Sequence, residues 1–545
     1  MRATNGPAIN VDGAAAVVNV NPKGSIIGRI DLTGNNDVVN NAGLFQVIGT
    51  SDFGAGVDVF NNLAGGVVSS PAGGGVLANC ETFNNSGTIT MVDGAANDSL
   101  SICGNYVGLP GAGLAIDVDG GAGGLTADEL IIGGNASGTT GVSLNLLPGS
   151  AVIDPDGVLV VDAATATGIP FTLVGPSRAG FIDYSLTQIG ADTFLVSRPD
   201  ASIFDVATLA QFGSELWDQS GDAHQSCAAS RRNDFGLVNR APLSVCGQLY
   251  RSEDRTGGDR TATLFSTPLT FSDRLKTKRW GAQLDLGYRP TDNLEFGLTG
   301  GYLHANANLA SGSDLEASGY NIGAYAEYGT ALGPYADLLV KHDVSRLRFT
   351  SPFIVDRPRP RARSTGVEGD AGWRMPAMGA ILDLNAALRY VHTSIDSFNA
   401  GLIGFGNGRT NSLRGSLAAR MTWTGNLGPF VEAKLLHEFN GGSRTVVSSG
   451  SLLDQLQGRG RGTWGRIEAG LSGNRGGGPL LSAWADVGNV KGWGVRAAYR
   501  FGGRATPPPP PPMMPPPPPP PAVETMPPSA PPPPPPPPAP GQRGD

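Results

Sequence analysis

The sequence predicts an all-β protein: an N-terminal parallel β-solenoid, a helical linker, a C-terminal twelve-stranded antiparallel transmembrane β-barrel and a disordered polyproline tail. Three observations lead to this fold class. A motif with paired asparagines recurs in the first hundred residues, apolar and polar residues alternate from about residue 246 onward, and the 545 residues include 80 Gly and 43 Pro. A composition so rich in turn formers argues against an ordinary helical enzyme.

The solenoid prediction rests on the repeat near the N-terminus. Asp37–Gly43, Asp58–Gly65 and Glu81–Gly87 each place an asparagine pair after apolar positions, with steps of 21 and 23 residues. One solenoid coil has about this length, and Asn and Gly suit its turns because they tolerate left-handed backbone angles and can stack in ladders. We expect coils over residues 1–103 and further strands between Gly-rich turns over residues 104–204. The alternative, a disordered Gly/Asn-rich tract, is disfavoured because the apolar positions recur in register.

Charge and cysteine usage also divide the chain. Residues 1–204 hold 5 Lys and Arg against 18 Asp and Glu, whereas the remaining residues hold 34 against 29. The acidic first half would repel phosphates, which argues against nucleic-acid binding. The cysteines form two sequence-local pairs without metal or redox spacing. In an oxidising compartment they are candidate disulfides, with three pairings possible and free buried thiols as the alternative: Cys80, Cys103, Cys227 and Cys246.

Residues 205–245 are predicted to be a helical linker. Leu209, Phe212 and Leu216 are spaced for one face of a helix, and Gly and Pro are scarce between residues 205 and 232.

Residues 246–502 are predicted to be the barrel. About twelve segments alternate apolar with polar residues, an even number as bacterial single-chain barrels require. They start near residues 246, 280, 293, 315, 332, 361, 379, 409, 427, 461, 479 and 492. The last places Trp493, Val495, Tyr499 and Phe501 on one face with arginines on the other. A soluble β-sandwich is the alternative, but aromatic residues near the strand ends are typical of membrane interfaces.

The Pro-rich tail, residues 503–545, is the last segment. Residues 507–540 contain 24 of the 43 prolines, so they can form neither a helix nor a strand ladder and are expected to be extended polyproline.

Candidate chemistry is sparse. All five histidines lie beyond residue 204, so a Ser/His/Asp triad or a His-based metal site is excluded from the first part. Asp117–Gly120 matches a calcium loop only weakly, because Ala122 stands where the turn glycine is needed. We therefore expect no catalytic residue, no cofactor, no metal and no enzymatic activity.

The N-terminal residues carry no export signal of a basic segment, apolar core and cleavage site. Because an outer-membrane barrel needs such a signal, we expect that the sequence is a fragment, a processed form or one with a wrongly placed start.

The order of solenoid, helical linker, twelve strands and terminal phenylalanine resembles a type V secretion autotransporter. Gly104–Gly108, Asp128–Thr140 and Phe181–Leu186 are similar to the end of a pertactin-like passenger, which helps the passenger fold. Gly247–Tyr250 is similar to the first barrel strand, where relatives often have Trp at the position of Cys246. The resemblance implies a right-handed solenoid as the passenger and an autochaperone-like region at residues 104–204.

The resemblance also implies a location and partners. The barrel would lie in the outer-membrane lipid, the linker would pass through its pore, the passenger would lie at the cell surface and the tail in the periplasm. Periplasmic chaperones and the barrel assembly machinery would act on a monomer, with Trp493, Val495, Tyr499 and Phe501 as the assembly signal.

The function that follows is display of a structural or adhesive passenger with an unknown surface ligand. The passenger is expected to stay attached, because Arg231–Asp234 offers one Asn and not the paired-asparagine cleavage setting of self-cleaving relatives. Two alternatives stay open: a translocator whose enzymatic passenger lies upstream of residue 1, and a solute porin.

Overall fold

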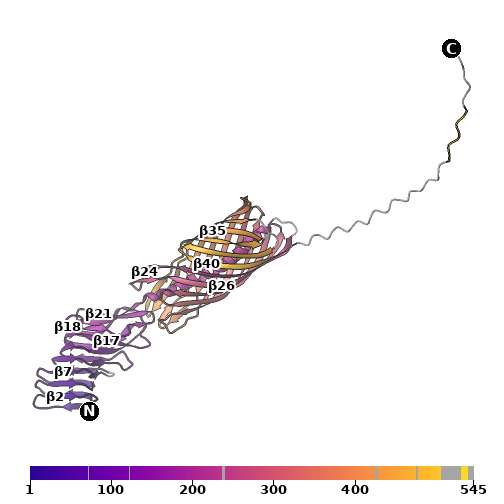
Figure 1. Cartoon of the computed structure of the whole chain (residues 1–545). Coiled ribbons are helices and arrows are strands. Elements are labelled where there is room, and N and C mark those ends of the chain that lie inside the picture. Colours follow the sequence, from indigo (N-terminus) through magenta and orange to yellow (C-terminus); the bar gives the residue numbers. More distant parts are fainter. Residues whose placement is uncertain are drawn as a thin grey trace.

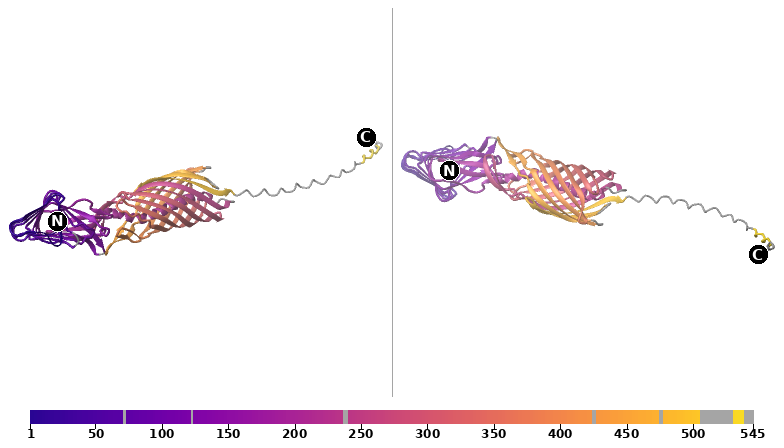
Figure 2. Two further views of the ribbon diagram at one scale, coloured as in Figure 1. Left: turned by 90° about the horizontal axis from the view of Figure 1, so that it is seen from below. Right: turned by 90° about the horizontal axis from the view of Figure 1, so that it is seen from above.

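The computed structural model describes residues 1–70, 73–121, 123–235, 240–423, 427–473, 477–504 and 530–537. The molecule is elongated, with a solenoid at one end and a barrel next to it (Figure 1). Both further views show the same end-to-end order (Figure 2). Most of the expected polyproline tail lies outside the described residues; residues 530–537 are exposed and belong to no helix or strand. Among the described residues, no helix is both long and apolar enough to cross a membrane.

The solenoid is built from short strands that stack coil upon coil. They are β1 (Arg2–Asn10), β2 (Val17–Val20), β3 (Ser25–Asp31), β4 (Val38–Asn41), β5 (Leu44–Gln46), β6 (Gly49–Asp52), β7 (Val59–Asn62), β8 (Val67–Ser69), β9 (Gly75–Ala78), β10 (Thr82–Asn85), β11 (Thr88–Thr90), β12 (Ser99–Ile102), β13 (Asn105–Gly108), β14 (Gly113–Gly121), β15 (Gly124–Ala127), β16 (Glu129–Gly138), β17 (Thr140–Leu146), β18 (Asp154–Ala166), β19 (Phe171–Leu173), β20 (Arg178–Ala179), β21 (Ile182–Ile189) and β22 (Asp192–Pro199).

Three parallel sheets form the faces of the solenoid. One face runs through β4, β7, β10 and β13, a second through β5, β8, β11 and β14, and a third through β6, β9 and β12. The register follows the sequence repeat, since Val38 pairs with Val59 and Val59 with Thr82. The sequence prediction of a coil per motif is therefore confirmed.

The paired asparagines stack in two ladders, as the repeat predicts. On the inner ladder, Asn41 donates to Asn62 at 2.9 Å and Asn62 donates to Asn85 at 2.8 Å. Asn85 then donates to the hydroxyl of Tyr106 at 3.0 Å, and this hydroxyl lies 2.7 Å from that of Thr140. The ladder satisfies side-chain amides that are fully buried, which would otherwise oppose coil stacking.

Aromatic rings fill the interior beside the ladder. Phe60 stacks on Phe83 with ring centroids 4.8 Å apart, and Phe83 stacks on Tyr106 at 6.0 Å. Each ring comes from the position before an asparagine pair or its counterpart in the next coil, so the repeat sets both the polar and the apolar stack.

The solenoid ends in an antiparallel sheet. β22 pairs with β18 on one side and with β21 on the other, so the last coil presents no open parallel edge toward the barrel. Asp128 lies within the coils that precede this cap, where its carboxylate accepts the backbone N–H groups of Asp98 at 3.0 Å and of Asp117 at 2.8 Å. Burial raises the pKa of Asp128 to about 6.

Helical structure follows the cap. The segments are η1 (Ala201–Ala207), α1 (Thr208–Arg231) and η2 (Arg232–Asp234). The predicted helical linker at residues 205–232 is thus a helix, extended by short 3₁₀ turns at both ends.

Twelve antiparallel strands form the wall of the barrel. They are β23 (Arg240–Thr256), β26 (Leu275–Thr291), β27 (Leu294–Leu309), β28 (Asp314–Gly329), β29 (Gly333–Thr350), β30 (Arg361–Ala377), β31 (Ala380–Ile395), β34 (Gly408–Trp423), β35 (Leu427–Asn440), β38 (Thr463–Gly473), β39 (Gly477–Gly488) and β40 (Lys491–Arg504). β23 pairs with β26 and with β40, which closes the cylinder.

All twelve predicted segments are strands of this wall. The first begins at Arg240 and not at Cys246, and residues 244–255 pair with both neighbouring strands. The second begins at Leu275 and not at Trp280.

One end of the barrel carries short turns and the other carries long excursions. The excursions on the solenoid side include the strands β24 (Asp259–Leu264), β25 (Thr267–Ser272), β32 (Phe398–Ala400), β33 (Ile403–Phe405), β36 (Ser443–Ser449) and β37 (Leu452–Gln457). These hairpins extend the wall toward the solenoid (Figure 1).

The ladder can be tested by replacing Asn62 with alanine. The change removes the hydrogen bond that Asn41 donates to residue 62 and the one that Asn85 accepts from it, and both groups are left without these partners in the solenoid interior. The free energy of unfolding of the solenoid should therefore fall by about 2 kcal/mol. This free energy is measured by urea denaturation of the full chain in detergent, with the trypsin resistance of the solenoid as the readout. Asn10→Ala, at an exposed position, is the control. Equal transitions for both variants would contradict the role of the ladder.

Candidate functional site

Helix α1 occupies the interior of the barrel. Nearly all its side chains are buried, and it contacts strands around the wall, including β23, β26, β30, β31, β34 and β40. A twelve-stranded cylinder is wider than side chains alone can fill, so a helix inside it replaces what would be a water channel. The helix is therefore the feature on which any transport through this barrel depends.

The predicted apolar face lies at the outer end of the pore. Leu209, Phe212 and Leu216 are each at most 1% exposed and belong to an apolar cluster that continues into the outer hairpins and the end of the solenoid. Phe204 extends this cluster by stacking on Phe271 of β25, with centroids 4.2 Å apart. The sequence identified these three residues as one buried face but did not show what covers them.

The central part of the helix, from Glu215 to Asp222, is acidic and faces a basic part of the wall. Glu215 pairs with Arg279 at 2.6 Å, Asp218 with Arg389 at 3.2 Å, and Asp222 with Arg389 at 2.8 Å. Further arginines reach the same carboxylates from other strands and loops: Arg414, Arg461 and Arg466.

The lower end of the helix has the opposite charge arrangement. Arg231 binds Asp285 at 2.8 Å and also pairs with Glu327, whereas Arg232 binds Asp370 at 2.8 Å and also pairs with Asp337. Each guanidinium has a third carboxylate within 4.0 Å, Glu295 for Arg231 and Asp383 for Arg232, and these carboxylates compensate its burial. Beyond them, Asp234 pairs with Arg500 of the final strand.

Trp217 marks the middle of the helix. Its indole N–H donates to the backbone oxygen of Lys341 at 3.0 Å, and the Lys341 ammonium lies 4.3 Å from the ring centroid. A Cβ at Gly366 would lie 2.8 Å from the indole, so the wall needs glycine where the ring passes.

A disulfide joins the helix to the wall. Cys227 on α1 and Cys246 on β23 are bonded, across 19 residues of sequence. Cys80 and Cys103 are free thiols, with Sγ atoms 3.1 Å apart. The Cys103 sulfur also lies 2.9 Å from the carbonyl oxygen of Cys80, so the two cysteines are neighbours, as a disulfide between them would require, but they are not bonded in this structure.

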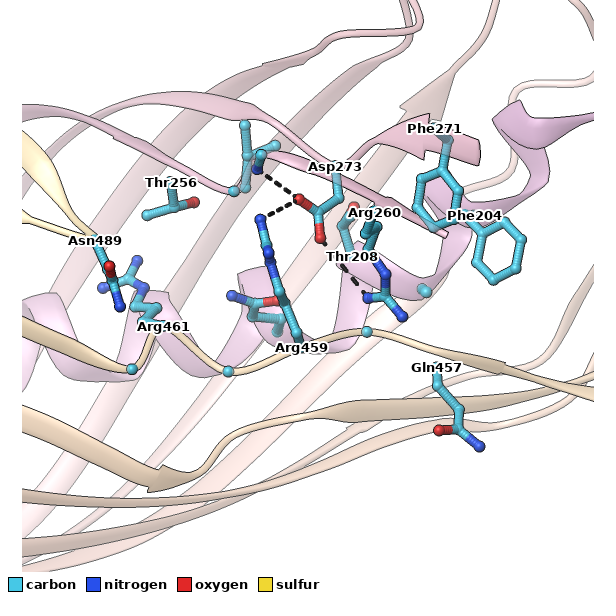
Figure 3. Close-up of a pocket in the computed structure, with 18 residues that line it drawn as sticks. Phe204, Thr208, Thr256, Arg260, Phe271, Asp273, Gln457, Arg459, Arg461 and Asn489 are labelled. Carbon is cyan, nitrogen blue, oxygen red and sulfur yellow. Dashed lines mark hydrogen bonds and ion pairs between the residues drawn. The ribbon is translucent and has the colours of Figure 1, made fainter. Parts of the chain in front are cut away.

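Two cavities border the helix. The larger, about 370 Å³, lies where the chain enters the barrel beneath the β24–β25 hairpin (Figure 3). There Asp273 accepts hydrogen bonds from the backbone of Gly258 at 2.8 Å and from Arg459 at 2.9 Å, and Arg260 lies 3.7 Å away (Figure 3). The smaller, about 50 Å³, lies inside the pore between the helix and the wall.

The end of the solenoid rests on the outer hairpins. Phe181 contacts Phe349 and Phe405, with ring centroids 6.4 and 6.0 Å apart, and the guanidinium of Arg178 lies 3.6 Å above the ring of Phe353. These contacts belong to one apolar cluster that runs from the coils into the barrel mouth.

The remaining predicted residues lie apart from the pore. Trp493, Val495, Tyr499 and Phe501 point outward from β40 and are 43–61% exposed. Asp117, from the weak calcium-loop match, is buried and accepts the backbone N–H groups of Asp93 and Gly94 at 2.8 Å, which is a structural role. Within the described ranges, no group of three or more His, Cys, Asp or Glu side chains is placed to hold a metal ion.

The charged contacts of the helix were not predicted from the sequence. Glu215, Asp218 and Asp222 follow a spacing of three and four residues, and Arg231 and Arg232 end the same helix. That pattern indicates an acidic face followed by a basic end, and it could have suggested a pore with two charged zones.

Comparison with known families decides what this arrangement is. Residues 269–488 match the Autotransporter beta-domain, and residues 78–186 match the Autochaperone Domain Type 1. The chain belongs to the autotransporter family. Its barrel is the outer-membrane translocator, its solenoid is the passenger, and the passenger lies on the surface side. Autotransporter barrels are outer-membrane proteins that use the barrel assembly machinery.

Individual relatives are more distant. Over 130 residues the autotransporter is 30% identical to "Probable autotransporter YfaL" of Escherichia coli strain K12, which covers 23% of this chain and 10% of that protein. The chain thus spans about a tenth of the length of this curated relative. Among solved structures it is similar to the translocator domain of autotransporter NalP from Neisseria meningitidis, with 13% identity, a TM-score of 0.41 and coverage of 54% of this chain and 99% of that chain.

A second solved structure is the transport unit of the autotransporter AIDA-I from Escherichia coli. The identity is 14% and the TM-score 0.37, with 51% of this chain and 96% of that chain covered.

The acidic half of the helix can be tested with Asp218→Asn and Asp222→Asn together. The change removes counter-charges of Arg389 and Arg466 inside the pore, and breaking a buried ion pair destabilises a protein by about 3–5 kcal/mol. We expect frequent single-channel openings in planar bilayers where the unmodified barrel is nearly silent.

Deletion of residues 208–231 is the positive control for this measurement, since it should give a fully open pore. Glu253→Gln with Glu316→Gln, two carboxylates of the outer wall, is the matched control. If the Asp218/Asp222 variant gave no more channel openings than the unmodified barrel, the ion pairs would not be what keeps the helix in place.

Proposed function

We propose that this autotransporter keeps its passenger attached and displays it as a structural or adhesive solenoid on the cell surface. The observation that carries the proposal is the unbroken helix α1, which joins the passenger to the barrel through the pore. Ion pairs in the central part and at the C-terminal end of the helix, together with the disulfide at Cys227, oppose its withdrawal. Arg231–Asp234, where self-cleaving relatives would need paired asparagines, is held by buried carboxylates and by Arg500.

A long, regular passenger supports the structural or adhesive role. Parallel coils give an extended surface on which a ligand can bind by repetition, and stability that grows with each stacked coil. The surface ligand is unidentified.

The alternative of an enzymatic passenger would place the catalytic module upstream of residue 1. Residues 1–204 contain no histidine, so this part of the passenger offers no triad base. The alternative of a solute porin requires an open lumen, whereas helix α1 occupies the interior of this barrel with nearly all its side chains buried. These observations favour display of the passenger.

The final strand is proposed as the assembly signal. Trp493, Val495, Tyr499 and Phe501 form a continuous outward apolar row on β40, where the assembly machinery can reach it before β40 pairs with β23. Periplasmic chaperones would keep the acidic passenger unfolded until then.

The tail is assigned to the periplasm. β40 ends at the short-turn end of the barrel, where Phe501 pairs with Gly477. We therefore propose that the residues after β40 continue on the side away from the passenger, and that the protein is a monomer.

Protease shaving of intact cells tests surface display. We expect loss of roughly the first 200 residues and survival of a protected barrel fragment that contains α1, because the wall and lipid shield it. Permeabilised cells are the control for protease access to the tail. A passenger fragment found in the culture supernatant without added protease would contradict attachment, and protection of the whole chain would contradict display.

The assembly signal is tested with Tyr499→Ala and Phe501→Ala together. Removing the two aromatic rings should lower the amount of folded barrel several-fold, read as the heat-modifiable band on a gel. Val487→Ala, an outward residue of the neighbouring strand β39, is the matched control and should leave assembly unchanged. Equal amounts of folded barrel from both variants would contradict the assignment of these residues as the assembly signal.

A further inference from the structure

The lipid-facing wall of the barrel is divided sharply by charge. From the middle of the wall to the short-turn end, the described outward-facing positions of the strands hold apolar, aromatic, small or uncharged polar side chains and histidine, with no Asp, Glu, Lys or Arg. Among the strand positions whose side chains the structure describes, the outward Lys and Arg lie within a few residues of the passenger-side ends of the wall strands, or on β36 beyond them: Arg251, Arg255, Lys276, Lys278, Arg346, Arg348, Arg361, Arg363, Arg409, Arg444 and Lys491. We call these residues the cationic belt. A membrane with two equal leaflets would give no reason for such asymmetry.

Like charges face each other directly within the belt. On three adjacent strands, Arg255 of β23 pairs in register with Lys276 of β26 on one side and with Lys491 of β40 on the other. Across the next part of the wall, Arg346 of β29 stands directly opposite Arg361 of β30. Like charges directly opposite in a sheet destabilise it, so each pair carries a cost that pairing within the protein does not remove.

A third such pair lies beyond these strands, where Arg409 of β34 stands opposite Arg444 of β36. Some neighbours in the belt are neutralised: Lys276 binds Glu253 at 2.9 Å and Arg348 binds Glu316 at 3.0 Å. Within the part of the chain that the structure describes, the other cations of the three like-charge groups have no carboxylate at ion-pair distance.

The belt lies at the level of lipid headgroups. Directly below it, outward rings form an aromatic band in which Trp280 contacts Tyr302 at 5.5 Å and Tyr302 contacts Tyr320 at 5.2 Å. Trp280 and Trp493 each stand two positions from an outward lysine on the same strand. Aromatic belts mark the boundary between hydrocarbon and headgroups, so the cations above this band face the headgroup layer of the outer leaflet.

We propose that the cationic belt binds the phosphate groups of phosphorylated glycolipid in the outer leaflet, with one phosphate shared by each like-charge group. A phosphate between two facing arginines accepts charge-assisted hydrogen bonds from both and removes their repulsion. Basic residues at a membrane surface attract anionic headgroups in this way. The belt thereby sets the depth of the barrel and holds a shell of lipid beneath the passenger.

The experiment titrates the detergent-purified full chain with diphosphorylated lipid A and follows tryptophan fluorescence, because Trp280 and Trp493 border the belt. Arg255→Gln, Arg361→Gln and Arg409→Gln together remove one cation from each like-charge group. We expect the Kd to rise at least tenfold, and the affinity of the unmodified chain to fall between about 50 and 200 mM salt as screening increases.

The matched control is Lys23→Gln, Arg29→Gln and Arg198→Gln, which removes three exposed charges from the passenger and should change the Kd less than twofold. Heat-modifiable migration checks that both variants are folded. A second comparison needs no variant, since the unmodified chain should bind dephosphorylated lipid A at least tenfold more weakly than the diphosphorylated form. Equal binding of the two lipids, or of the folded belt variant and the unmodified chain, would overturn the proposal.

Discussion

A cylinder of twelve strands encloses more space than its own side chains can fill, and in this molecule helix α1 fills it. The rest of the structure follows from that constraint. The inward faces of the strands carry charges, which cost several kcal/mol each when buried without partners. The helix supplies those partners in two zones, with Glu215, Asp218 and Asp222 against arginines and Arg231 and Arg232 against carboxylates. Reversing the helix would set like charges against each other, so the pairing fixes its direction as well as its depth.

The same helix couples the barrel to the passenger. Its upper end enters an apolar cluster that continues without a break through the outer hairpins into the solenoid coils. Phe181 of the passenger end lies between Phe349 and Phe405 of the barrel side. A passenger end that buries its apolar surface against the barrel mouth has a fixed starting surface on which successive coils can stack, each supplying the next Asn rung.

The outer surface of the barrel wall faces a different environment from the pore. Its apolar band meets hydrocarbon, its aromatic band meets the interface, and the outward cations whose side chains are described lie on the passenger side. Charges are therefore used in two ways in one barrel. Inside, they are matched by the helix at distances near 2.8 Å, whereas outside, three groups of like charges face each other across strand pairs, and of their described cations Lys276 alone has a carboxylate partner, Glu253.

Local periodicity by itself determined much of this protein. Steps of 21 and 23 residues predicted the coils and the Asn ladders, and alternation predicted all twelve wall strands, because a pleated strand turns successive side chains to opposite faces. The spacing of Leu209, Phe212 and Leu216 predicted a buried helix face. Tertiary structure alone decided which inner charges pair, that Cys227 bonds to Cys246 while Cys80 and Cys103 stay unbonded, and that Arg346 faces Arg361. Those contacts depend on how the strands close around the helix and on the register between strands, and the periodicity of a single segment determines neither.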